Sequence, residues 1–162
     1  MPFRKPDIGF VPTPPELIDA MLSLAEVQPT DLIYDLGSGD GRILIRAAQR
    51  FGARGIGLEI DHDRLQQAEV AVDRAGVSHL VKFRHQDLFA ATCTDATIVM
   101  LYLLPHLNLR LRPQLLRQLQ PGTKIVSRDF DMGDWPPDLT LKVPEPEESI
   151  LYCWHVPPHP CL

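Results

Sequence analysis

Apolar and polar positions alternate along the chain in two different rhythms. Short apolar runs, typical of buried strands, are separated by longer stretches in which apolar residues recur every three or four positions, as on one face of a helix. Gly and Pro, which commonly end such elements, lie at many of the boundaries. This pattern predicts five strands, at residues 32–36, 55–60, 81–85, 96–101 and 124–127.

The stretches around and between these strands predict four helices. The first is expected to begin at Thr13, as the N-cap of a capping box that Glu16 completes. Two more carry apolar stripes and end at Gly52 and Gly76, since glycine readily takes the left-handed conformation that follows a helix. The fourth is expected to begin at Pro113.

Strands that alternate with helices form βαβ units and a mainly parallel sheet. Two further runs, 139–143 and 150–156, are expected to pair as a hairpin at an antiparallel edge of that sheet. We therefore predict a single-domain α/β protein with a Rossmann-like, doubly wound sheet. Residues 1–29 are expected to form an N-terminal segment and helix that pack on a core of residues 30–162.

Length and composition narrow the choice of partners. A chain of 162 residues that is 44% hydrophobic can bury one core without disulfides. The net charge of −5 argues against a nucleic-acid partner, because nucleic-acid binding normally needs a basic face. No run approaches the ~20 apolar residues of a membrane-spanning helix, and no secretory signal is evident. The three cysteines are scattered, which favours a reducing compartment, so we expect a cytoplasmic protein.

Glycines are concentrated in the stretch YDLGSGDGR, residues 34–42, between a predicted strand and a predicted helix. Backbone N–H groups at such a junction attract negative charge. A P-loop is excluded because no Gly-Lys-Ser/Thr follows. A dinucleotide-binding loop needs a small residue at the third glycine position, where this chain has Arg42. Asp35, just before the loop, would repel a phosphate and instead suits a cationic ligand.

The pattern Asp35-x-Gly-x-Gly-x-Gly resembles the glycine-rich motif of class I S-adenosylmethionine-dependent methyltransferases. Glu59, at the end of the second predicted strand, matches the carboxylate that this family places on both ribose hydroxyls. Asp87, after the third strand, matches the acidic residue that accepts from the adenine amino group, and Leu88 would present its backbone N–H to the ring. The resemblance implies S-adenosyl-L-methionine as the cofactor. The cofactor contacts that it implies are Thr13, Tyr34, Asp35, Gly37, Ser38, Gly39, Asp40, Glu59, Ile60, Asp87, Leu88 and Leu101.

A narrower resemblance covers nearly the whole chain. The segments GFVPTPPELIDAML, LYLLPHLNLRLRP and GTKIVSRDFDMGDW look like those of small single-domain bacterial methyltransferases. These are similar to the mitochondrial protein-lysine methyltransferases of the ATP synthase c subunit and the adenine nucleotide translocase, which implies a protein lysine as acceptor. Two differences concern that acceptor. The chain lacks the hydrophobic targeting segment of the mitochondrial relatives, and DFDMGDWPPD stands where a helix usually joins the fifth and sixth strands.

The acceptor is expected beyond the carboxyl ends of the fourth and fifth strands, because ligands of open α/β sheets bind at that edge. Tyr102, Asp129, Asp131 and Trp135 follow these strands, and the first two are the candidate catalytic residues. A carboxylate there suits capture of a lysine ammonium more than its deprotonation, since it raises the pKa of the amine. The alternative is that the aromatic residues belong to the core and the acids to a solvated loop, and Arg128 could pair with one of them.

Two other interpretations remain open. The acceptor could be a small metabolite or an oxygen nucleophile, or the chain could be a module that binds the cofactor without turnover. Methyl transfer from a sulfonium is an in-line displacement that mainly requires positioning, and no Ser-His-Asp or Cys-His arrangement is evident. We expect no metal, because the spacing of the candidate zinc ligands matches no recognised pattern. These candidates are Cys153, His155, His159 and Cys161.

Overall fold

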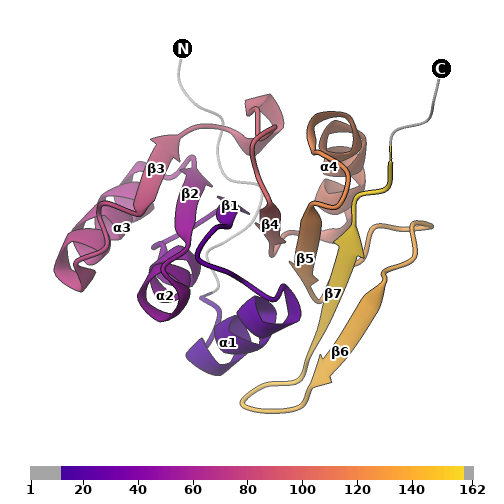
Figure 1. Ribbon diagram of the computed structural model, residues 1–162, viewed down its shortest axis with the longest axis horizontal. Helices are drawn as coiled ribbons and strands as arrows, with labels where there is room; N and C mark the ends of the chain where they lie inside the picture. Colours follow the sequence, from indigo (N-terminus) through magenta and orange to yellow (C-terminus); the bar gives the residue numbers. More distant parts are fainter. Residues whose placement is uncertain (1–11, 159–162) are drawn as a thin grey trace.

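The computed structural model describes residues 12–158. Seven strands form one sheet in the order β3-β2-β1-β4-β5-β7-β6 (Figure 1). The first five strands along the chain are parallel, and β7 runs antiparallel to both β5 and β6. The predicted doubly wound sheet and its C-terminal hairpin are therefore confirmed. The strands are β1 (Leu32–Leu36), β2 (Arg54–Glu59), β3 (Val81–His85), β4 (Ile98–Leu101), β5 (Lys124–Arg128), β6 (Leu139–Val143) and β7 (Ser149–His155).

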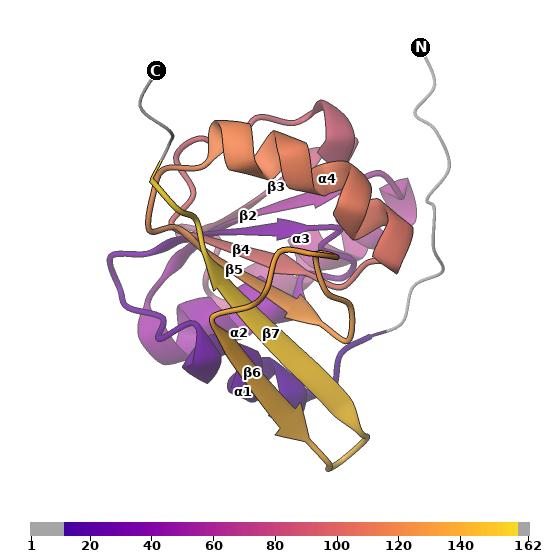
Figure 2. The same ribbon diagram turned by 90° about the vertical axis from the view of Figure 1, so that its right-hand side faces the viewer.

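Helices cover both faces of this sheet. In Figure 2, α4 lies above the sheet, and α1 and α2 lie beneath it. A short 3₁₀ turn, η1, follows β3. The bounds are α1 (Pro15–Leu24), α2 (Arg42–Phe51), α3 (His62–Ala75), η1 (Leu88–Ala90) and α4 (Pro105–Gln118).

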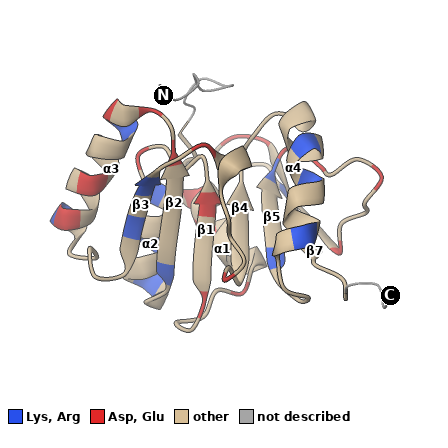
Figure 3. Cartoon of the chain, turned by 90° about the horizontal axis from the view of Figure 1, so that it is seen from above, with Lys and Arg blue, Asp and Glu red and all other residues tan. Residues whose placement is uncertain are grey.

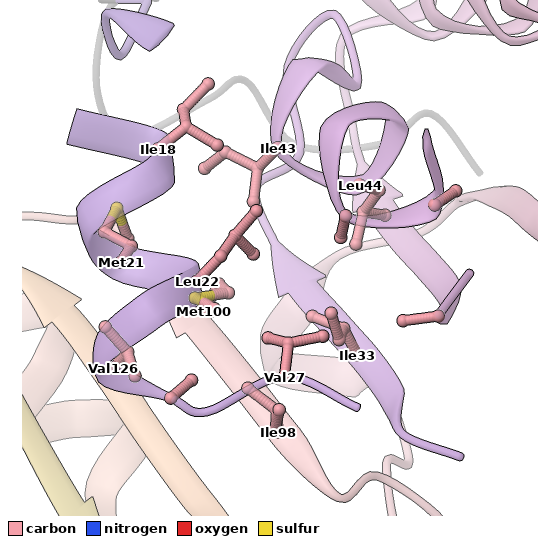
Figure 4. Close-up of a cluster of buried hydrophobic side chains, with 14 of the residues drawn as sticks. Ile18, Met21, Leu22, Val27, Ile33, Ile43, Leu44, Ile98, Met100 and Val126 are labelled. Atoms are coloured by element: carbon pink, nitrogen blue, oxygen red, sulfur yellow. The ribbon is translucent and has the colours of Figure 1, made fainter. Parts of the chain in front are cut away.

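One hydrophobic cluster fills the face beneath the sheet. In this cluster Ile18, Met21 and Leu22 of α1 and Ile43 and Leu44 of α2 lie between the helices and the buried side chains of β1 and β4 (Figure 4). These positions recur every three or four residues along each helix, so a single apolar stripe of each helix is buried. The segment ahead of β1 thus contributes to the core, while the division of the chain after residue 29 stays a prediction.

A second cluster lies between the sheet and α4. Leu107, Leu111 and Leu115 follow one another at four-residue spacing and are almost fully buried against Val99 and Ile125 of the central strands. This stripe begins well before Pro113, and α4 itself begins at Pro105. The predicted helix start at Pro113 was wrong.

Two local rules explain where the helices begin. Proline at the first turn of a helix costs little, because its missing N–H would lack a helical partner anyway, and this applies to Pro105. Pro113 faces solvent inside α4, where its unfavourable effect of roughly 3 kcal/mol is offset by the buried leucine stripe. The capping box at Thr13 was also wrong. Pro14 occupies the N-cap of α1, and within the described chain no side chain caps that end.

Candidate functional site

The sheet order reverses between β1 and β4. From β1 the chain moves to β2 on one side, and from β4 it moves to β5 on the other. In open α/β sheets this reversal opens a crevice beyond the carboxyl ends of the two strands, and ligands bind there. The glycine loop, residues 37–41, follows β1 at this position (Figure 1).

The glycine loop has a backbone that other residues rarely adopt. Gly37, Gly39 and Gly41 have φ angles of 91°, 58° and 82°. L-residues other than glycine are strained in this left-handed region. Three such residues in alternation turn the chain sharply from β1 into α2, so the N–H groups of the loop lie at the head of that helix.

A second requirement for small residues comes from the packing of Phe83 of β3. A Cβ atom on Gly41 would lie 2.7 Å from Cζ of Phe83, and one on Gly57 of β2 would lie 2.6 Å from Cδ1 of the same ring. The Cβ on Gly57 would also lie 2.6 Å from the hydroxyl of Ser38. The loop therefore fits closely against β2 and β3.

Glu59, at the end of β2, is tied directly to this loop. Its Oε1 atom accepts from Gly39 N at 2.8 Å, and its Oε2 atom accepts from Ile60 N and Asp61 N, each at 3.0 Å. The side chain is only 7% exposed. Because a carboxylate offers about four acceptor positions, three backbone donors hold Glu59 in place and still leave acceptor capacity for a ligand. Glu59 thus sets the distance between the loop and the end of β2.

Asp35 is a buried carboxyl group of β1 with 4% exposure. Burial raises its pKa well above the usual value of 3.8, and the negative charges of Glu59 and Asp40 raise it further. All of these influences disfavour the ionised form. A cation bound beside Asp35 would reverse this effect.

Asp40 is held by Arg42 at the start of α2. The two side chains form an ion pair with an Nη2–Oδ2 distance of 2.7 Å. Burial alone would raise the pKa of Asp40, but the hydrogen bonds and the charge of Arg42 outweigh it, and the pKa is lowered. Arg42 also donates from Nη1 to the carbonyl oxygen of Thr13 at 3.4 Å, so the segment ahead of α1 reaches the glycine loop.

The segment after β3 lies beside the end of β2. Gln86 N donates to Glu59 O at 3.2 Å, and His85 Nε2 lies 3.0 Å from Ile60 O. Asp87 accepts from Phe89 N at 2.9 Å and is the N-cap of η1, which begins at Leu88. The candidate ribose and adenine residues Glu59, Ile60, Asp87 and Leu88 are thus brought together.

Two expected cofactor contacts point elsewhere. The hydroxyl of Tyr34 donates to Asp95 Oδ1 at 2.7 Å, and Asp95 lies ahead of the amino end of β4, away from the glycine loop. Burial, reinforced by Asp95, raises the pKa of Tyr34 to about 12. Leu101 ends β4 at the correct edge, but its side chain is buried in the cluster beneath α4.

Tyr102 follows β4 and packs against the residues at the end of β5. Its ring lies nearly parallel to that of Phe130, with 6.4 Å between centroids and 12° between planes. The guanidinium carbon of Arg128 lies over the Tyr102 ring, 4.3 Å from its centroid. The structure thus brings the candidate catalytic tyrosine against Arg128 and Phe130, the two residues that flank the candidate carboxylate Asp129.

Asp129 is engaged in the main-chain pairing of the sheet. Its N–H donates to Ile150 O at 2.7 Å, and its Oδ1 atom accepts from Ile150 N at 3.0 Å. Its Oδ2 atom lies 3.7 Å from Nε of Arg128, and its φ angle is 66°. The expected pairing of Arg128 with one of the loop acids is present. The carboxylate therefore has partners before any acceptor arrives.

The remaining acceptor-side candidates lie farther along the same loop. Asp131 accepts from Gly133 N at 3.0 Å, and Asp134 is paired with Arg112, which lowers the pKa of Asp134. Trp135 is half-buried, and its carbonyl accepts from Nε1 of Trp154 at 2.9 Å. Trp135 therefore belongs partly to the core, whereas Asp131 is exposed.

Sequence reasoning missed one residue that shapes this side. Asn108 of α4 is fully buried, and its Nδ2 atom lies within hydrogen-bond distance of Ser127 Oγ, Phe130 O and Asp131 O, at 3.1–3.2 Å. It thereby holds the loop after β5 against α4. The signal in the sequence was a polar residue beside the leucine stripe of that helix.

The side chains at the glycine loop fit S-adenosylmethionine. The Ser38 hydroxyl is buried without a hydrogen-bond partner among the described residues, and Asp35 lacks any influence that would favour its charge. A ligand with an amino group and a sulfonium centre would supply the positive charge and donors that these groups need.

Residues 12–158 contain neither a metal-binding cluster nor a membrane-spanning helix. Within this range no group of three His, Cys, Asp or Glu side chains could hold a metal ion, and no helix is long and apolar enough to cross a bilayer. His159 and Cys161, two of the conceivable zinc ligands, lie outside the described residues. The cytoplasmic location stays a prediction.

Comparison with protein families and curated sequences identifies relatives over most of the chain. Residues 35–139 match the family described as the ANTKMT methyltransferase domain. A protein-lysine N-methyltransferase of Saccharolobus islandicus is 37% identical over 139 residues, which cover 85% of this chain and 86% of that protein. The human lysine N-methyltransferase of the ATP synthase c subunit is 30% identical over 83% of this chain. The match spans 57% of the human protein, little over half its length.

Solved structures add a close neighbour. The chain matches an RNA methyltransferase of Salinibacter ruber, solved in complex with S-adenosyl-L-homocysteine, with a TM-score of 0.89 and 52% identity. The match covers 93% of this chain and 97% of that one. A geranyl diphosphate methyltransferase in complex with SAM has a TM-score of 0.71 at 13% identity and supports the fold alone.

Proposed function

The chain belongs to the ANTKMT methyltransferase domain family and is an S-adenosylmethionine-dependent methyltransferase, and we propose that its acceptor is a lysine side chain of a protein. The observation that carries this proposal is the 37% identity, over 85% of the chain, to a protein-lysine N-methyltransferase. The human relative, whose name specifies a lysine of the ATP synthase c subunit, supports the same acceptor chemistry.

The residues around the glycine loop are proposed to hold the cofactor. Bound S-adenosylmethionine supplies a methyl group activated by a sulfonium charge. Glu59 would bind the ribose hydroxyls and Asp87 the adenine amino group, with the N–H of Leu88 also facing the ring. Asp35 would balance the positive charge of the cofactor, because burial and the acidic neighbours Glu59 and Asp40 leave its own negative charge uncompensated. The other proposed contacts are Thr13, Gly37, Ser38, Gly39, Asp40 and Ile60, whereas Tyr34 and Leu101, whose side chains point elsewhere, are proposed to contribute main-chain atoms only.

Tyr102 and Asp129 are proposed to receive the acceptor. Both lie at the carboxyl ends of β4 and β5, beside the glycine loop in the sheet order. Tyr102 would orient the amine, and Asp129 would attract its ammonium form. An in-line displacement needs the nucleophile aligned with the bond that breaks, so positioning is the main contribution of these residues.

The acceptor must lose a proton before it can attack. A lysine with the ordinary pKa near 10.4 costs about 4–5 kcal/mol to deprotonate at pH 7. Burial of the amine and the nearby sulfonium both lower that pKa. Asp129 opposes this change, but its existing pairing with Arg128 and Ile150 N weakens the effect.

RNA is a second candidate acceptor, because the Salinibacter ruber relative is named an RNA methyltransferase and is 52% identical. The charge distribution gives this candidate little support. The chain carries a net charge of −5. Basic residues are spread over α2, β3 and α4, and acidic residues lie on α3, on β1 and in the loops (Figure 3). RNA binding normally uses a continuous basic surface.

The purified protein should be incubated with cell extract and S-adenosylmethionine labelled in the methyl group. We expect label in protein, sensitive to protease and resistant to ribonuclease, and recovered as methyl-lysine after acid hydrolysis. Label that ribonuclease removes would replace the protein acceptor with RNA. Label confined to small molecules would favour a metabolite acceptor.

A further inference from the structure

Arg128, at the end of β5, is a buried cation. Its side chain is 3% exposed, and such a charge is tolerated only when its hydrogen-bonding groups are matched. Its Nη2 atom pairs with Glu147 Oε1 at 2.9 Å, and its Nη1 atom donates to Thr13 Oγ1 at 3.2 Å. Its Nε atom lies 3.4 Å from Ser149 Oγ and 3.7 Å from Asp129 Oδ2. One guanidinium thus links the segment ahead of α1, the end of β5 and the β6–β7 hairpin.

The same guanidinium lies over Tyr102. Its central carbon is 4.3 Å from the ring centroid, a distance at which cation–π attraction is strong when both groups are shielded from water. The planar fork of arginine can stack on the ring and still use its N–H donors in the plane. Phe130 lies nearly parallel to the Tyr102 ring. Arg128 therefore helps to fix the direction in which the tyrosine points.

Thr13 connects this cluster to the glycine loop. Its hydroxyl accepts from Arg128, and its carbonyl oxygen accepts from Arg42, whose guanidinium is paired with Asp40. Thr13 is 4% exposed. Thr13 therefore lies between two arginines. Arg42 is fixed at the glycine loop by Asp40, and Arg128 is stacked on the Tyr102 ring.

We infer that Arg128 is a positioning residue for methyl transfer. It holds the ring of Tyr102 and, through Thr13, fixes the acceptor side relative to the glycine loop. The inference rests on the proposed function only in that an acceptor reaches Tyr102, whether this acceptor is a protein or an RNA. Loss of Arg128 should disturb alignment of the acceptor more than binding of the cofactor.

Four variants test this inference: Arg128→Met, Arg128→Lys, Thr13→Val and Thr13→Ser. The acceptor probe is the set of extract macromolecules that the parent enzyme labels, and cofactor affinity is measured by calorimetry. Misalignment by about 1 Å can cost ~100-fold in rate, so labelling by Arg128→Met should fall at least ~10-fold while cofactor affinity changes less than ~3-fold. Arg128→Lys should recover only part of the loss, because it lacks the planar fork.

Thr13→Val, which removes the hydroxyl at nearly constant volume, should also slow labelling at saturating cofactor, where weaker cofactor binding has no effect on the rate, and Thr13→Ser should recover part of that loss. Arg117→Met, at an exposed arginine of α4, is the control and should label at the parental rate.

Parental labelling by Arg128→Met would overturn the inference. The inference would also be overturned if Arg128→Met lost cofactor affinity and rate in parallel while Thr13→Val had no effect, since that result indicates a role in folding alone. If Arg128→Met does not fold, Arg128→Lys and the Thr13 pair carry the test. The proposed lysine acceptor is tested separately: it is contradicted if ribonuclease removes the label. The labelling rates of the same variants are then compared with RNA as the acceptor.

Discussion

Asp35 is the residue whose environment most clearly awaits a ligand. The carboxyl is buried, and both charged groups that shift its pKa, Glu59 and Asp40, are acidic and raise it. The folded protein therefore retains a proton on Asp35 at pH values where the unfolded chain, with a pKa near 3.8, has released it. The stabilisation is complete below the unfolded pKa and is lost as the pH rises through the folded pKa. At higher pH an ionised Asp35 destabilises the unliganded protein.

Asp35→Asn should therefore raise the melting temperature of the unliganded protein at pH 7–8, and the gain should shrink towards pH 4. Each kcal/mol corresponds to about 2–4 °C for a chain of this size. The same variant should bind S-adenosylmethionine at least ~10-fold more weakly, because a hydrogen bond to a charged group contributes about 1.5–3 kcal/mol. Thermal melts across pH and calorimetry measure the two effects.

Asp73→Asn, at an exposed position of α3, is the matched control and should change neither quantity appreciably. A lower melting temperature for Asp35→Asn at every pH would contradict the electrostatic account of this site. Unchanged cofactor affinity would mean that Asp35 does not face the cation.

Glu59→Gln tests the link between the end of β2 and the glycine loop. The substituted amide keeps the shape of the side chain but loses acceptors for the N–H groups of Gly39, Ile60 and Asp61. We expect cofactor affinity to fall by about 10–150-fold, the equivalent of 1.5–3 kcal/mol, together with a lower melting temperature. Glu69→Gln, at an exposed position of α3, is the control. Parental affinity in Glu59→Gln would place the ribose elsewhere.

At this scale the sequence predicts residues that act within a short motif and misses those that act across the fold. Asp35, Glu59 and Asp87 could be proposed as cofactor contacts because each lies at or just beside the carboxyl end of a recognisable strand. The contact between Arg128 and Thr13 joins residues 115 positions apart, and Asn108 reaches a loop about 20 positions away. No local pattern encodes which distant loop a buried polar side chain will meet.

At the scale of elements, β2 carries two glycines that face different parts of the molecule. A Cβ on Gly57 would meet Ser38 of the glycine loop, whereas one on Gly55 would lie 2.8 Å from Cδ2 of Leu44 in the core. Both substitutions crowd a packed neighbour and should destabilise the protein by about 1–3 kcal/mol. Gly57→Ala alone should also weaken cofactor binding. Unfolding curves and calorimetry on the two variants separate the effects, and equal affinities would show that the loop tolerates displacement of Ser38.

The predicted elements differ from the structure mainly where proline was given too much weight. Strand positions agree within two residues because buried parallel strands are short apolar runs with clear boundaries. The early half of α4 was missed because Pro113 looked like a helix start, although the leucine stripe continues on its N-terminal side. Periodicity over several turns predicts a helix better than a single proline.

At the scale of the whole molecule, one sheet edge gathers the proposed cofactor and acceptor sides. The glycine loop follows β1, Tyr102 follows β4 and Arg128 ends β5, so three neighbouring strands supply both sides. Fold class follows from the order of strands and helices, which is why it could be predicted. The proposed acceptor side consists of the loops after β4 and β5, where local patterns carry little information.

The pH dependence of transfer distinguishes an amine acceptor from other acceptors. Below the pKa of a lysine acceptor, the reactive neutral fraction rises about 10-fold per pH unit, and kcat/KM at saturating cofactor should rise with it between pH 7 and 9. Tyr34, whose pKa is raised to about 12, and the buried thiols of Cys93 and Cys153, raised to about 11, do not ionise in this range. Label incorporation from S-adenosylmethionine should be measured at each pH, with a melting curve to confirm that the protein remains folded. A rate independent of pH would contradict an amine acceptor, because the neutral fraction of a free lysine amine rises throughout that interval.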